Sequence, residues 1–497
     1  MIPRPRWPRS ALGTMAASAL VLAALAGCDG SLLDVEDPDN VQPSSELSPG
    51  DIPSRFGGVV SDFANMYDFY VLYAGLLTDE FVLAGTFPTR LEIDRREPNS
   101  SNSSIDEEVW EPLSVSRASA DALVEQFGDA LGDPDFAGTE DQLRQGIAFG
   151  TLLGGYDRIY FAEIFCQSIF GGQDDLPRIG SAPPESAPVS SSDRMQQALQ
   201  LLRQAETAAA DADEEDVGLA ALVGQARAQM WLGNHQEAAD LVAGVPDDFV
   251  FLVEYSDNTI AQENEVFQQT WNVNTGGLRW TVGDGSDASR GNERWGYFDE
   301  WVDQGLVLPA SVAAGPAGKN AFNGTSPVSL QTLYAGRSGQ AGSDAPIVLA
   351  SGWEARMIEA ENELRGGSPE VAQGIVNDLL EDPDQAANPM VQVMPSLAEP
   401  SATGDFTDEQ LGAFDPVDFG DEPLQGDLAE LARARAAGLW MTGERQSTLR
   451  RFAEEFGDRS ALGLYPDRPG DAISLPVPSA EVDNNSNIGS ACPAGLP

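Results

Sequence analysis

The chain has 497 residues, a formal net charge of −51 at pH 7 and Lys319 as its only lysine. This balance excludes nucleic acid as a partner, because binding phosphates requires basic patches that release counterions. We interpret the acidity as a solvated surface, and no acidic run has the spaced ligands and glycine of a known calcium loop. We therefore leave a metal site unassigned and predict no cofactor.

The sequence lacks the motifs of nucleophilic and metal-dependent catalysis. It contains no G-x-S-x-G, H-E-x-x-H or phosphate-loop pattern, and His235 is its only histidine. These absences argue against a catalytic triad and against a histidine metal site. Glycoside hydrolysis needs only a pair of carboxylates, so a surface glycoside hydrolase remains open as an alternative function.

The N-terminus has the pattern of an export signal. A basic stretch with three arginines precedes an apolar run over 11–26, which is too short for a stable membrane span. The next residues, Leu-Ala-Gly-Cys over 25–28, resemble the bacterial lipobox, in which the peptidase cuts before the cysteine and acyl chains are attached to it. Several acyl chains hold a domain at a membrane durably.

We therefore expect a lipoprotein signal peptide over 1–27, a lipid anchor on Cys28 and an acidic tether over 28–50. An ordinary signal peptide with an incidental cysteine is the alternative. No later segment is apolar for about 18 consecutive residues, so we expect the body of the protein not to span a membrane.

Residues 51–497 are expected to form a single, mainly α domain. Ser104 and Glu107 have the spacing of a capping box and predict a helix start. A longer helix is expected from about Thr139 to Cys166, where glycine recurs at 146, 150 and 154. These glycines would share one helix face, which allows a neighbouring helix to approach closely.

Two helical hairpins follow from the spacing of apolar residues. The first lies between Leu219 and Pro246 and turns at Gly233, and its sequence resembles a tetratricopeptide repeat. The second spans Leu349 to Leu380, with Leu349 expected on a helix face. Together they predict a helical-repeat scaffold of tetratricopeptide-like hairpins, interrupted by irregular insertions around 251–345 and 388–426.

The first insertion contains the densest group of aromatic rings. Its candidate ligand-binding residues are Trp280, Trp295, Tyr297, Trp301 and Arg294, because sugar C–H faces pack on rings while hydroxyls take hydrogen bonds. A second candidate segment, 67–90, contributes Asp79 and Arg90. The alternative is structural: the rings would fill a small core under the insertion, and Tyr67 and Tyr70 would pack a helix.

After Cys28, two cysteines remain, Cys166 and Cys492. An exported protein enters a compartment that permits disulfides, so we predict that these two are bonded to each other. Two buried free thiols are the alternative.

Five stretches in order resemble the SusD/RagB family of outer-membrane, nutrient-binding lipoproteins. They are LLDVEDPDN, GIAFGTLLGGYDRIYFAEIFCQSIFGG, SGWEARMIEAENEL, GLWMTGERQSTLRRF and LPVPSAEVDNNSNI, and they extend from Leu32 to Ile488. Within them, Arg356 and Arg445 with neighbouring glutamates match family positions that are expected to build the scaffold through partly buried ion pairs.

The resemblance implies a surface-exposed, lipid-anchored protein of the outer membrane with a SusD-like fold. It also implies a function: capture of an oligosaccharide or a peptide and its delivery to a SusC-like, TonB-dependent barrel transporter, without catalysis. The extreme acidity and the near absence of lysine depart from the family pattern and leave the ligand class open. A tetratricopeptide scaffold lipoprotein of envelope assembly is the remaining alternative.

Overall fold

The computed structural model describes residues 47–78, 80–83, 87–169, 187–270, 278–280, 344, 346–381, 417–420, 423–439, 442–457, 469–485 and 487–488. The chain divides into two units, 1–46 and 47–497, and every described residue belongs to the second unit. The expected signal peptide and Cys28 therefore lie outside the described residues. Among the described helices, none is long and apolar enough to cross a bilayer.

The described chain is mainly α-helical, as predicted. Its α-helices are α2 (Ile52–Leu77), α3 (Pro88–Asp94), α4 (Ser103–Ile105), α5 (Glu111–Ala130), α6 (Glu140–Ile164), α7 (Ser191–Asp211), α8 (Glu215–Trp231), α9 (His235–Val242), α10 (Glu265–Thr270), α14 (Gly352–Gly366), α15 (Pro369–Glu381), α19 (Leu424–Gly438), α20 (Glu444–Phe456) and α21 (Ser479–Asn484). The shorter turns are η2 (Pro49–Asp51), the π-helical η3 (Asp106–Trp110), η4 (Pro134–Phe136) and η6 (Ile260–Gln262).

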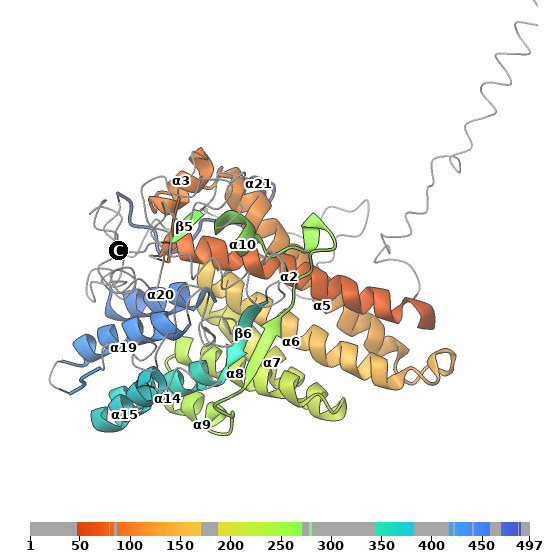
Figure 1. The fold of residues 1–497 in the computed structure, drawn as a ribbon. Helices are drawn as coiled ribbons and strands as arrows, with labels where there is room; N and C mark the ends of the chain where they lie inside the picture. The colour runs from red at the N-terminus through yellow and green to blue at the C-terminus, as the bar shows by residue number, and fades with distance from the viewer. Residues whose placement is uncertain are drawn as a thin grey trace, which may run out of the picture. The chain divides into compact units, whose positions relative to one another are not determined.

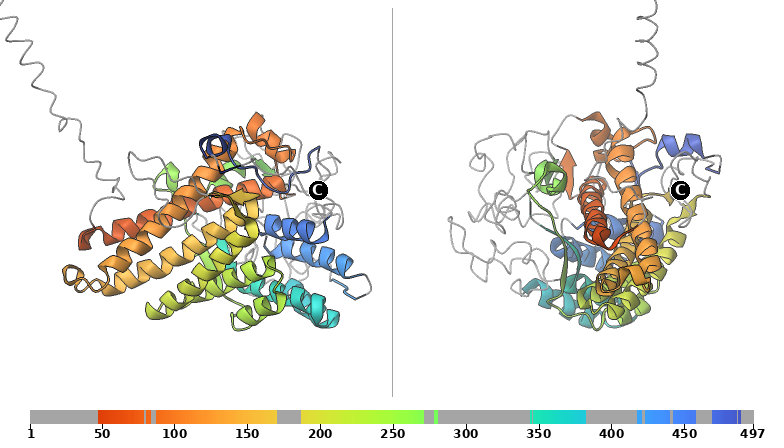
Figure 2. Two further views of the ribbon diagram at one scale, coloured as in Figure 1. Left: turned by 180° about the vertical axis from the view of Figure 1, so that it is seen from behind. Right: turned by 90° about the vertical axis from the view of Figure 1, so that its right-hand side faces the viewer.

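The helices pack in a continuous succession, each against the next. Helix α2 contacts α5, which contacts α6, and the series continues through α7, α8, α9 and α14 to α15 and α19. The long helices α5, α6 and α7 lie side by side in Figures 1 and 2. Both predicted hairpins are present, as α8–α9 and α14–α15, so the spacing of apolar residues located them correctly.

The strands form three two-stranded antiparallel sheets. They are β1 (Phe81–Leu83) with β5 (Leu278–Trp280), β2 (Gln167–Ser168) with β3 (Val189–Ser190), and β4 (Val250–Val253) with β6 (Ile347–Ser351). Leu349 therefore lies in a strand, and its expected place on a helix face was wrong. Strand β6 is buried throughout, and a short buried strand has the same apolar run as a buried helical turn.

Helix α6 confirms the expected role of its glycines. A Cβ on Gly146 would lie 2.3 Å from the ring of Phe127 in α5, and one on Gly150 would lie 3.0 Å from Val124. Gly154 lies against the same helix, near Asp121. The small residues therefore let α5 and α6 approach each other closely.

Helix α4 begins at a different cap from the one expected. The side chain of Asn102 accepts hydrogen bonds from the amides of Ser104 and Ile105. Ser104 is the second residue of the helix, and its hydroxyl bonds Thr89. The predicted cap, Ser104, was therefore wrong by two residues. Asn102 can take its place because asparagine is as good an N-cap as serine.

Helix α20 is buried although its residues are polar. Every residue from Glu444 to Ala453 is buried. Arg450 donates hydrogen bonds to the carbonyls of Ala162, Glu163 and Phe165, at 3.0, 3.0 and 2.7 Å. These carbonyls end α6 and lack helical partners, so the guanidinium caps the C-terminus of that helix.

Ion pairs join α20 to its other neighbours. Arg451 forms two bonds with Glu361 of α14, at 2.5 and 2.6 Å, and Glu444 contacts Arg227 of α8. Burial alone would raise the pKa of Glu361, but the charge and hydrogen bonds of Arg451, together with the charges of Arg365 and Arg435, outweigh it and hold the pKa at about 2. Removing one partner of a buried pair costs about 3–5 kcal/mol, because a charge is left uncompensated.

The two arginines singled out by the family resemblance also have partners in the scaffold. Arg356 pairs with Glu359 at 3.1 Å, and Arg445 donates to the carbonyl of Ala432 at 3.0 Å.

Cys166 takes part in a disulfide bond. Its partner lies outside the described residues, so the pairing with Cys492 stays a prediction. The backbone next to Cys166 favours it: Phe165 forms a parallel bridge with Leu475, which brings a segment close to the C-terminus beside the cysteine.

Replacing Gly146 with alanine should destabilise the protein by about 1–3 kcal/mol, because the added methyl group overlaps the buried ring of Phe127. The matched control is Gly128→Ala in α5, where a Cβ meets nothing within 4 Å. That variant should be neutral or stabilise the helix by up to about 1 kcal/mol. Urea unfolding of both variants measures the difference, and equal stabilities would contradict the close packing of α5 and α6.

The stability of the fold should fall as the pH rises through neutrality. Burial raises the pKa of Glu354 to about 7, against the opposing charges of Arg227 and Arg435. A raised pKa favours the folded state below the unfolded pKa of 4.5 and disfavours it as the pH passes about 7. From about pH 5.5 to about pH 8.5, this group should remove about 2 kcal/mol of unfolding free energy.

Urea unfolding at the two pH values measures this loss. Glu354→Gln should flatten the dependence, because glutamine does not ionise, whereas Glu237→Gln at an exposed ion pair should leave it unchanged. Identical pH profiles for the wild type and Glu354→Gln would exclude Glu354 as the source.

Candidate functional site

The pairing of β1 with β5 joins the two segments that the sequence singled out. Phe81 is the register partner of Trp280, and Leu83 is the partner of Leu278. Trp280 begins the aromatic cluster of the first insertion, and Asp79 lies two residues before Phe81. Two candidate regions that lie about 200 residues apart in the sequence therefore come together at this pair of strands.

Several predicted site residues lie outside the described part of the chain. They are Asp79, Arg294, Trp295, Tyr297 and Trp301, and the side chain of Trp280 is also outside it. Their role in binding stays a prediction, as do lipidation of Cys28 and the bond from Cys166 to Cys492. Trp280 is placed through its backbone in β5, at the end of that strand.

Arg90, the other predicted ligand-binding residue, is held in a network of partners. Its guanidinium donates to Glu108 at 2.9 and 3.1 Å and to the side-chain oxygen of Gln269 at 2.9 Å. The hydroxyl of Tyr73 donates to the same carboxylate oxygen of Glu108. Arg90 thus connects α3, η3 and α10, and only 12% of its side chain is exposed.

Phe87 is a candidate that the sequence analysis missed. It immediately precedes α3 and is 50% exposed. The guanidinium carbon of Arg90 lies over its ring, 5.3 Å from the ring centroid. Helix α3 packs against β1, so this ring belongs to the joined region. An aromatic residue just before a proline at a helix start, Phe-Pro-Thr-Arg, was the available signal.

The aromatic residues of α2 belong to the core. Tyr67 and Tyr70 are fully buried, and the ring centroids of Tyr70 and Tyr160 are 4.1 Å apart. The hydroxyl of Tyr70 donates to Glu163 at 2.7 Å, and that of Tyr67 donates to the carbonyl of Val348 at 2.6 Å. The structural alternative is therefore correct for these two rings.

Two carboxylates near the candidate site, those of Asp68 and Glu108, bind groups of the protein. Asp68 is buried and accepts a hydrogen bond from the backbone amide of Glu265 at 2.8 Å. Burial raises the pKa of Asp68 well above its ordinary value, despite that bond. Glu108 is occupied by Arg90 and Tyr73, and the described residues contain no cluster of three or more potential metal ligands.

The site thus combines an exposed aromatic ring, a braced arginine and the start of an aromatic-rich segment. It is mounted on α2, whose buried tyrosines fix it to the helical body. Such an arrangement can present flat apolar surface and a few polar groups to a ligand.

Comparisons with known proteins place the fold. No family model matches the sequence, and no curated protein matches it. A SusD/RagB family protein from Bacteroides thetaiotaomicron has a TM-score of 0.62 at 15% identity, over 89% of this chain and 95% of that one. A SusD homologue from the same organism has a TM-score of 0.58 at 13% identity, over 92% and 98%. A laminarin-binding SusD-like protein has a TM-score of 0.52 at 15% identity, over 87% and 97%.

Proposed function

We propose that this chain, which has the fold of the SusD/RagB proteins, is a cell-surface lipoprotein that captures a nutrient for a SusC-like, TonB-dependent transporter of the outer membrane. The observation that carries the proposal is the pairing of β1 with β5. It brings the start of the aromatic-rich segment 280–301 to the region of Arg90 and the exposed ring of Phe87.

The ligand class is an oligosaccharide or a peptide. Aromatic faces pack against sugar C–H groups and against peptide side chains, and both ligands leave polar groups for hydrogen bonds. One protein of the same fold is described as laminarin-binding. The polysaccharide laminarin is therefore the first ligand to test.

Binding without catalysis fits the described carboxylates better than hydrolysis does. A glycosidase requires two carboxyl groups that flank the scissile bond, about 5–10 Å apart. In the described part of the site, Glu108 is bound to Arg90, and Asp68 is buried against the amide of Glu265. A scaffold of envelope assembly would bind through its repeat groove and would not use an exposed ring at Phe87.

The lipobox-like residues 25–28 support the proposed lipid anchor, and the SusD-like fold supports the proposed partner. A lipid on Cys28 would hold the body at the membrane, where a barrel transporter can receive the ligand. The acidic surface disfavours anionic cargo, because like charges repel.

Phe87→Ala and Trp280→Ala should each weaken binding of laminarin at least tenfold, which corresponds to about 1.4 kcal/mol. Each variant removes a ring on which a sugar can stack. Val115→Ala, which truncates an exposed residue on α5, is the control and should bind like the wild type. Isothermal titration, repeated with a panel of soluble glycans and peptides, measures the affinities. Hydrolysis of the bound glycan, or full affinity in both aromatic variants, would contradict the proposal.

Cys28→Ala should release the protein from the membrane, since alanine cannot be acylated. Fractionation of cells that make the wild type or the variant measures this release, and mass spectrometry of the N-terminal peptide detects the acyl chains. The wild type, extracted in detergent, should also co-purify with a barrel transporter. A wild-type protein that is free of lipid and of any barrel partner would rule out the proposed location.

A further inference from the structure

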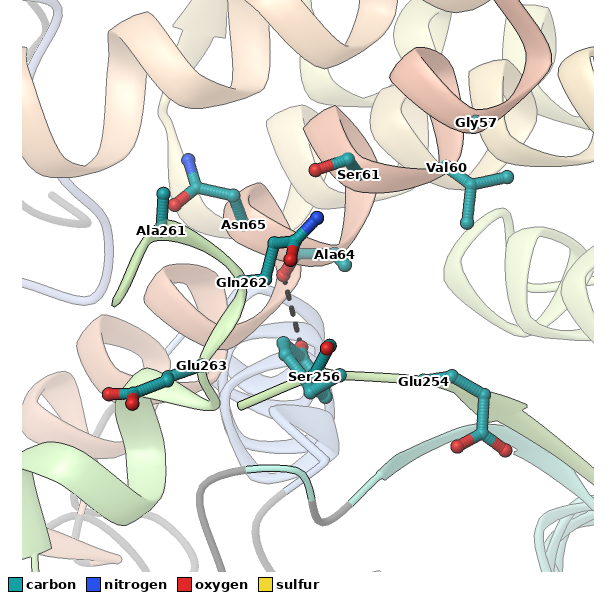
Figure 3. A pocket seen from close by; sticks show the side chains of 11 residues that line it. Gly57, Val60, Ser61, Ala64, Asn65, Glu254, Ser256, Ala261, Gln262 and Glu263 are labelled. Carbon is teal, nitrogen blue, oxygen red and sulfur yellow. Dashed lines mark hydrogen bonds between the residues drawn. The ribbon is translucent and has the colours of Figure 1, made fainter. Parts of the chain in front are cut away.

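A cavity of about 250 Å³ lies between α2 and the segment from Glu254 to Glu263 (Figure 3). Its α2 wall consists of Gly57, Val60, Ser61, Ala64 and Asn65, which share one helix face because they stand three or four residues apart. A larger hollow of about 740 Å³ differs from it, because it is lined by residues of α7 alone.

The opposite wall is fixed by hydrogen bonds within the protein. The hydroxyl of Tyr255 donates to the carbonyl of Ala64 at 3.0 Å, which attaches the segment to α2. The amide of Ser256 donates to the carbonyl of Gln262 at 2.9 Å and closes the turn around η6. The cavity is therefore preformed, which lowers the entropy that a ligand must overcome.

The polar groups at the cavity are neutral. Ser61, Asn65 and Gln262 lie at the gap between α2 and η6, whereas the carboxylates of Glu254 and Glu263 extend away from it (Figure 3). Within the described part of the chain, these three neutral side chains make no hydrogen bonds. The carboxylate of Glu263 already accepts a bond from the side-chain amide of Gln268 at 2.6 Å.

The volume limits the ligand to one small ring. Pockets for drug-sized ligands measure roughly 300–1,000 Å³, so this cavity is too small for an extended chain. Hydroxyl and amide side chains supply both donors and acceptors, while Val60, Ala64 and Ala261 supply apolar surface. The glutamates at the edge of the cavity disfavour phosphates and acidic sugars, because like charges repel.

We propose that this cavity is a second saccharide subsite, which binds a single neutral sugar ring apart from the aromatic site. The choice of a sugar rests on the proposed function, whereas the position of the subsite rests on the cavity itself. Helix α2 serves both sites, because Asp68, one turn after Asn65, contacts the start of α10.

Neighbouring glycines in α2 provide a matched pair of variants. Gly57 lines the cavity, and Gly58, about 100° around the helix, does not. A Cβ at either position meets nothing within 4 Å, and leucine has a higher helix propensity than glycine, so both variants should fold. Gly57→Leu places an isobutyl group over the cavity, whereas Gly58→Leu adds the same group outside it.

The test uses saturation-transfer NMR on the full chain carrying Phe87→Ala and Trp280→Ala, so that the aromatic site does not contribute. The probes are D-glucose, D-galactose, D-mannose and D-xylose, with D-glucosamine as the cationic comparison. At least one neutral sugar should bind, Gly57→Leu and Asn65→Ala should weaken its binding at least tenfold, and Gly58→Leu should leave it unchanged. Circular dichroism melting confirms that each variant is folded.

Three outcomes would overturn the subsite: no neutral sugar binds, Gly57→Leu binds as well as Gly58→Leu, or glucosamine binds more tightly than every neutral sugar. Failure of the proposed function gives a different result. In that case the wild type binds no glycan or peptide, or binds one with an affinity that Phe87→Ala and Trp280→Ala leave unchanged.

Discussion

The buried polar contacts of α20 are the constraint on which the rest of the structure depends. The described hydrophobic residues form two clusters, one around α2 and α5–α8 and the other around α14, α15, α19 and α20. Leu449 and Phe452 of α20 pack in the second cluster, while Arg450 is bonded to the end of α6 in the first. Because a buried guanidinium tolerates few geometries, these bonds help to fix how the two clusters meet, and with them the position of α2, which carries the candidate site.

Much of the helical architecture could be predicted because it depends on local spacing. Glycine at every fourth residue of α6 predicted a close helix contact, and the structure places Phe127 and Val124 against those glycines. Burial of α20 could not be derived from its composition, since glutamate, arginine and glutamine are typical of an exposed helix face. The burial is stable only because α20 pairs with residues far away in the sequence, such as Glu361. Local periodicity carries no information about such contacts.

The candidate site was predicted in part. The sequence identified Trp280 and Arg90 as residues of interest, but nothing in their spacing indicated that β1 and β5 pair. Pairing between short strands far apart in sequence carries almost no local signal, because three residues suffice for each strand. Phe87 was missed for a related reason: a single aromatic residue before a proline acquires meaning only when its exposure and its contact with Arg90 are known.

The bonds between Arg450 and the carbonyls that end α6 join residues 285 to 288 positions apart. Closing so long a loop weakens the finished structure little, because each doubling of length costs only about 0.6 kcal/mol, but distant contacts slow folding. A chain synthesised from its N-terminus therefore completes the end of α6 only after nearly all of it has been made. The final packing of α6 is therefore a late event in folding. A polypeptide that ends before residue 450 lacks the guanidinium that binds the carbonyls at the end of α6.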